Sequence, residues 1–96
     1  MTVTTQVNAA IQSVKDSGAE GSFGGRVALI ILNQYLIEAS SQGHLPRNGI
    51  DLARFRNAVV SGKRRLSVLE QTREDAIHLA TNLARNSLLS VMNTRS

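Results

Sequence analysis

The chain has 96 residues, a length that fits one domain and leaves no room for two. It contains no cysteine, which excludes disulfides and thiolate metal sites, and its hydrophobic content of 42% is too high for an intrinsically disordered protein. An aromatic content of 3% means that the core is built from aliphatic side chains, and a formal net charge of +4 points to negatively charged partners.

The first element in the chain is an amphipathic helix, predicted over residues 2–15. Its apolar residues recur at the spacing of one helix face, and they are Val3, Val7, Ala10, Ile11 and Val14. Residues 16–25 hold four of the seven glycines, so they predict a loop, with Phe23 anchoring it to the core.

Residues 26–41 form the most apolar stretch of the chain, and their apolar side chains cover nearly the whole circumference of a helix. A short apolar run also fits a buried strand, but this one has about the length of a helix and no partner strand is visible, so we expect a central buried helix. Gly43 suits the residue after its C-terminus, and residues 44–47 form a tight connection.

The next helix begins with Asn48 as its N-cap and Asp51 in its first turn, and it ends or weakens at residues 61–62. The rest of the chain is also helical in pattern. Residues 72–75 resemble a capping box, which favours a break near Thr72 and a last helix over residues 73–92. One continuous helix bent at that point is the alternative.

The predicted fold is therefore all-α: a small bundle of three to four helices with short loops, in one domain over residues 1–96. Residues 1–25 supply the N-terminal helix and the glycine-rich loop, and residues 26–96 supply the main core. Because a chain this short buries little surface, and the last helix has a wide apolar face, we expect a homodimer through that face. The predicted dimer interface consists of Ala76, Ala80, Leu83, Ala84, Leu88 and Val91.

The charge is unevenly distributed along the chain. Residues 44–73 contain seven basic and two acidic residues, a net charge of +5, whereas the remaining residues sum to −1. The basic residues of this segment, our candidate nucleic-acid-binding set, are Arg47, Arg54, Arg56, Lys63, Arg64, Arg65 and Arg73. On a helical wheel the cations lie beside or opposite the apolar stripe, and arginine forks suit phosphate oxygens. The alternative is an ordinary solvated helix face.

Residues 61–67 resemble the tail that follows the recognition helix in phage-repressor helix-turn-helix domains, and Ala39 and Gly43 have the spacing of that motif. The stretch between Gly43 and Ser61 holds only one helix, so a scanning helix, a turn and a recognition helix do not fit. We therefore do not predict a helix-turn-helix.

No catalytic or metal-binding constellation is visible in the sequence. His44 and His78 have no second ligand at metal-binding spacing, and the glycines at 18–25 lack the Lys-Ser/Thr of a phosphate-binding loop. The acidic residues at 51, 70, 74 and 75 are explained as helix starts or solvated positions. We expect no enzyme activity, no metal and no cofactor.

Two functions remain open. The first is a small regulatory or accessory protein that contacts the phosphate backbone of a DNA or RNA duplex through residues 47–73. In architecture alone, this predicted dimer looks like the small helical dimers by which nodaviruses shield double-stranded RNA from host silencing. The second is a protein-interaction module, an adaptor, inhibitor or secretion chaperone, whose apolar C-terminal helix docks a partner and whose arginines meet an acidic protein surface.

The sequence also suggests where the chain works. Its first six residues have neither a basic start nor an apolar run behind them, so we expect no secretory signal. Its longest apolar run, residues 27–32, is far shorter than the roughly 20 residues that span a bilayer, so we expect no membrane partner. A cytoplasmic location is the default, in the host cell if the chain is viral.

Overall fold

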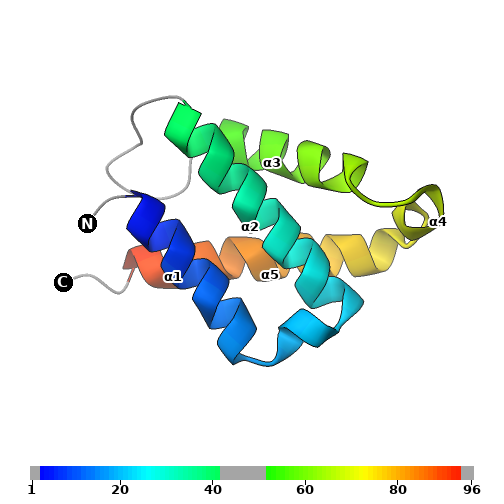
Figure 1. Cartoon of the computed structure of the whole chain (residues 1–96), viewed down its shortest axis with the longest axis horizontal. Coiled ribbons are helices and arrows are strands. Elements are labelled where there is room, and N and C mark those ends of the chain that lie inside the picture. Colours follow the sequence, from blue (N-terminus) through cyan, green and yellow to red (C-terminus); the bar gives the residue numbers. More distant parts are fainter. Residues whose placement is uncertain (1–2, 42–51, 94–96) are drawn as a thin grey trace.

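A computed structural model of the chain describes residues 3–41 and 52–93 (Figure 1). In these two ranges the chain forms helices and no strand, which confirms the all-α prediction. The elements in chain order are α1 (Val3–Asp16), the 3-10 helix η1 (Ala19–Gly21), α2 (Phe23–Ser41), α3 (Leu52–Arg64), α4 (Val68–Gln71) and α5 (Glu74–Asn93). The expected connection at residues 43–47, the N-cap Asn48 and the first-turn Asp51 lie outside the described residues.

Helix α2 is the centre of the fold, because it packs against α1, α3 and α5. In Figure 1 it crosses in front of α5, with α1 on one side and α3 on the other. The fully buried apolar residues of α2 are Val27, Ala28, Ile31, Leu32 and Tyr35. The prediction of a central buried helix is confirmed, although the helix begins at Phe23, three residues before the predicted start.

Helix α1 is amphipathic, as the spacing of its apolar residues predicts. Val7, Ala10 and Val14 are buried in the common core, whereas Asn8 and Gln12 on the other side are exposed. The helix packs against both α2 and α5, so it closes one side of the core.

The glycine-rich connection is shorter than predicted, because η1 and the first turn of α2 occupy most of residues 16–25. Gly18 has a φ of 80°, a left-handed turn conformation that glycine adopts without strain. Gly25 lies inside α2, where a Cβ would sit 1.7 Å from the carbonyl oxygen of Ala19. The glycine at this position therefore allows η1 to pack directly on α2. Phe23 packs against the core, as expected.

Helix α3 continues through Gly62, where the sequence predicts an end or a weak point. Gly62 is buried, and a Cβ there would lie 3.3 Å from side-chain atoms of both Ile30 and Ile31. The missing side chain lets α3 approach α2 closely. This close packing opposes the helix penalty of glycine, which is about 1 kcal/mol relative to alanine.

The break near Thr72 is confirmed, but the capping around it differs from the prediction. The capping box belongs to α4: Ser67 Oγ accepts a hydrogen bond from the Glu70 N–H at 3.1 Å, and Glu70 Oε1 accepts one from the Ser67 N–H at 2.9 Å. Thr72 instead donates its hydroxyl to the carbonyl oxygen of Leu69 at 2.6 Å. A capping box at residues 72–75 is therefore wrong, because the Thr72 hydroxyl satisfies the end of α4.

The apolar face of α5 lies in the core of the single chain. The residues predicted to face a second copy are Ala76, Ala80, Leu83, Ala84, Leu88 and Val91. Ala80, Ala84 and Leu88 are at most 1% exposed, and the other three are partly buried, because α5 packs against α1 and α2. Helices of the same chain therefore cover Ala80, Ala84 and Leu88, and the predicted interface is not tested. The homodimer itself stays a prediction.

Candidate functional site

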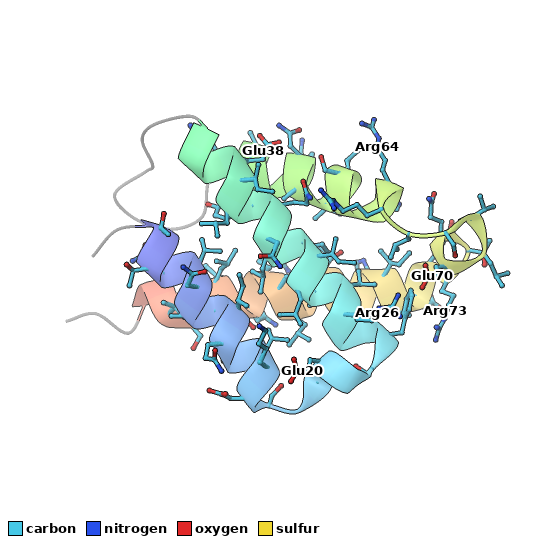
Figure 2. All side chains as sticks on the ribbon, in the orientation of Figure 1. Glu20, Arg26, Glu38, Arg64, Glu70 and Arg73 are labelled. Atoms are coloured by element: carbon cyan, nitrogen blue, oxygen red, sulfur yellow. The ribbon has the colours of Figure 1, made fainter. Side chains whose placement is uncertain are left out.

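Helix α3 and the residue after it carry a set of exposed cations. Phe55, Ala58 and Gly62 are buried, so residues at other helical phases point outward. Arg56, Lys63 and Arg64 on α3 and Arg65 just after it are exposed, and we name these four residues the α3 cationic edge. Figure 2 shows Arg64 pointing away from the body of the molecule.

Most charges of the α3 cationic edge have no carboxylate partner among residues 3–41 and 52–93. In the part of the chain that the structure describes, Arg56, Lys63 and Arg64 form no ion pair. Arg65 is held by a neutral group: with the Gln34 amide oxygen facing it, the guanidinium Nε and Nη2 donate hydrogen bonds to that oxygen at 2.6 and 3.1 Å. An amide partner orients the guanidinium but leaves its charge available to an anion.

The other predicted cations are not all gathered on this edge. Arg73 stacks on the ring of Phe23 at the start of α2, with its guanidinium carbon 4.1 Å from the ring centroid. Figure 2 shows Arg73 and Arg64 at different sides of the molecule, so the structure does not bring Arg73 to the α3 cationic edge. Arg54 lies on α3 but is half-buried, and Arg47 lies outside the described residues.

Arg73 belongs to a second cluster, which ties the turn around α4 to the start of α2. Arg26 also lies near the Phe23 ring, at 6.0 Å, and its Nη2 forms an ion pair with Glu70 Oε2 at 2.7 Å. Hydrogen bonds from the Ser67 backbone and then from Arg26 to the ionised carboxylate lower the pKa of Glu70 below its ordinary value of 4.5. Contacts within the chain therefore account for the positions of Arg26 and Arg73.

The lowered pKa of Glu70 predicts a pH-dependent contribution to stability. A carboxyl with a lower pKa in the folded state stabilises the protein above its unfolded pKa, and this contribution is lost as the pH falls through the folded value. We expect Glu70→Gln to lower the unfolding midpoint at pH 7 and to have a smaller effect as the pH falls below about 4. Thermal unfolding of both proteins between pH 3 and 7 tests this, and a difference that does not change with pH would contradict it.

The sequence does not single out the arginine that lies opposite α3. A hollow of about 390 Å³ lies between α3 and α5, and its lining residues are Leu52, Phe55, Arg56, Val59, Thr81 and Arg85. A second hollow of about 280 Å³ is lined by Val59, Lys63, Glu74, Ile77, His78 and Thr81. Both are lined by Val59 and Thr81, so the two hollows adjoin along α3 and α5, and we name them together the α3–α5 groove. Arg85 is not among the site residues predicted from the sequence. Helical phase gives the direction in which Arg85 points from α5, but it does not say which helix lies next to that side.

The described residues offer no other chemistry of an obvious kind. In residues 3–41 and 52–93, no three His, Cys, Asp or Glu side chains are grouped so that they could hold a metal ion. Among the helices of these same ranges, none combines the length and the apolar character needed to cross a bilayer. Comparison of the chain with known protein families, with curated proteins and with solved structures gives no match.

Proposed function

We propose that the chain binds the phosphate backbone of a nucleic-acid duplex through the α3 cationic edge. The observation that carries this proposal is the group of exposed cations on one short helix, three of them without a carboxylate partner among the described residues. Arg56 and Lys63 are seven positions apart, which places them on one flank at a separation of roughly 10 Å along the axis. Side chains at this separation can contact several phosphates of a duplex backbone.

The aromatic residues favour backbone contacts over the reading of unpaired bases. Proteins that bind single strands stack bases on exposed rings. Here the chain has only three aromatic residues, and all three are engaged: Tyr35 and Phe55 are buried with ring centroids 6.1 Å apart, and Phe23 lies beneath Arg73. A duplex, recognised by its shape and charge, is therefore the better fit.

The alternative proposal, a protein-interaction module, is less well supported by the surface of α5. It relied on the apolar face of α5, and Ala80, Ala84 and Leu88 of that face are buried within the chain. A homodimer would place two α3 cationic edges on one particle and strengthen duplex binding, and light scattering tests that point separately. A small regulatory or accessory role in the cytoplasm is the context in which we place this binding.

Titration of labelled duplex DNA and RNA at two salt concentrations tests the proposal. With about four phosphate contacts, the affinity should fall by about a hundredfold between roughly 50 and 200 mM salt. The double variant Arg64→Ala/Arg65→Ala should bind more weakly at the lower salt concentration and keep the helical circular-dichroism signal. No detectable binding at low salt, to either duplex, would contradict the proposal.

A further inference from the structure

The α3–α5 groove shares Arg56 and Lys63 with the α3 cationic edge, but its other lining residues lie outside that edge. Its walls are apolar at the centre, where Phe55 and Ile77 are only 6% and 4% exposed and Val59 is partly buried. Thr81, shared by both hollows, donates its hydroxyl to the carbonyl oxygen of Ile77 at 2.9 Å. This polar group is therefore satisfied within α5, and it does not require a polar partner from outside.

The groove exists because α3 and α5 both pack on α2 and only weakly on each other. Gly62 brings α3 down onto Ile30 and Ile31 of α2, so the closest approach of α3 is to α2. Leu52, at the mouth of the groove, remains 65% exposed although it is a large apolar side chain. A groove between two helices, with apolar side chains at its centre, polar side chains around them and an exposed leucine at one end, is the type of surface that accepts an amphipathic helix.

The charged residues along the groove indicate which charge a bound helix should carry. Arg56 and Lys63 line the groove from α3 and Arg85 lines it from α5, and the one carboxylate among the described lining residues is that of Glu74. A second copy of this chain, whose net charge is +4, fits such a rim poorly. We infer that the α3–α5 groove binds an amphipathic helix of a partner protein, with apolar residues on one face and acidic residues beside them.

The dimensions agree with a short helical segment. The lining residues run from Leu52 to Lys63 on α3 and from Glu74 to Arg85 on α5. Each stretch is about 16 Å long at the rise of an α-helix, which corresponds to about three turns of a bound helix. Apolar residues at spacings of three and four would lie on Val59 and Ile77, and flanking carboxylates would reach the cations.

A designed peptide tests this inference with the intact protein. The probe is a fluorescein-labelled helical peptide of about 14 residues, with leucines along one face and glutamates on both flanks. The matched peptide carries lysine in place of every glutamate. We expect the wild-type protein to bind the acidic peptide, to shift the amide resonances of Val59, Ile77 and Thr81, and not to bind the basic peptide.

Matched variants locate the binding on the protein. Leu52 and Leu79 are 65% and 67% exposed, but only Leu52 lines the groove. We expect Leu52→Asp to weaken peptide binding about tenfold or more, and Leu79→Asp to leave it unchanged. Arg85→Glu should weaken it similarly, whereas Arg64→Glu, which changes an exposed arginine outside the groove, should not. Circular dichroism on each variant confirms that these exposed positions do not alter the fold.

The outcome does not depend on duplex binding. Arg64→Glu should weaken binding of a duplex and spare the peptide, and Leu52→Asp should do the reverse, so failure of one proposal leaves the other intact. Absence of binding to the acidic peptide would overturn the inference. Equal binding of the basic peptide, or equal loss of binding in Leu52→Asp and Leu79→Asp, would also overturn it.

Discussion

Gly25→Ala is expected to destabilise the protein by about 3 kcal/mol, a large effect for the addition of one methyl group. The new Cβ would lie 1.7 Å from the carbonyl oxygen and 2.3 Å from the carbonyl carbon of Ala19. These are backbone atoms, so no change of side-chain rotamer relieves the overlap, and η1 must move away from α2. Urea unfolding followed by circular dichroism measures the loss directly.

Gly24→Ala is the matched control, because it adds the same methyl group one residue earlier. A Cβ at Gly24 meets nothing within 4 Å, and Gly24 lies in the first turn of α2. Alanine there should be neutral or should stabilise the helix by up to about 1 kcal/mol, because it restricts the unfolded chain. If the two variants were equally stable, the close packing of η1 on α2 would not exist in solution.

The second large effect is expected for Leu88→Ala, which should cost about 2–5 kcal/mol of unfolding free energy. Leu88 is 0% exposed in the single chain, and it belongs to the core cluster to which α1, α2, α3 and α5 all contribute. Truncation leaves a cavity that its neighbours fill only in part. Because the cavity lies inside one chain, the loss should not change with protein concentration.

Leu79→Ala makes the same substitution on the same helix at a side chain that is 67% exposed. It should change stability by less than about 0.5 kcal/mol. A dimer interface gives a different result, because stability then rises with protein concentration through mass action. A concentration-dependent midpoint that Leu88→Ala abolishes would place Leu88 between two chains and would contradict the packing described above.

Helices with a strong apolar pattern were predictable from the sequence. The all-round apolar pattern of residues 26–41 gave the central position of α2, and the one-sided spacing of Val7, Ala10 and Val14 gave the buried face of α1. In both cases the pattern alone decides what must be buried. The break near Thr72 was also predictable, since Arg73 interrupts the apolar stripe of a continuous helix.

The close packing at Gly25 and Gly62 was not predictable, because the local sequence gives only the cost of a glycine to helix stability. Gly25 was expected in a loop and Gly62 near the end of a helix, yet both lie inside helices. Each glycine leaves room for a neighbour that is not adjacent in sequence. This neighbour is Ala19 for Gly25 and Ile30 for Gly62. Close approach of two elements is a tertiary fact that helix propensity does not contain.

The candidate site divides in the same way. Helical phase predicts that Arg64 points outward, and it is exposed. Helical phase does not predict that Arg73 stacks on the ring of Phe23, which lies fifty residues earlier in the chain. It also does not predict that Arg85 and Arg56 line the same groove. Helical phase likewise gives the apolar face of α5, but it does not say that α1 and α2 pack against this helix.

The salt dependence of duplex binding tests the central claim most directly. The logarithm of the binding constant falls with the logarithm of salt concentration with a slope of about 0.9 per phosphate contact. Arg64→Ala removes one cation of the α3 cationic edge, and Lys15→Ala removes one exposed cation of α1. The account predicts that the slope drops by about one for Arg64→Ala and is unchanged for Lys15→Ala. Equal slopes for wild type and Arg64→Ala, or equal drops in the two variants, would contradict it.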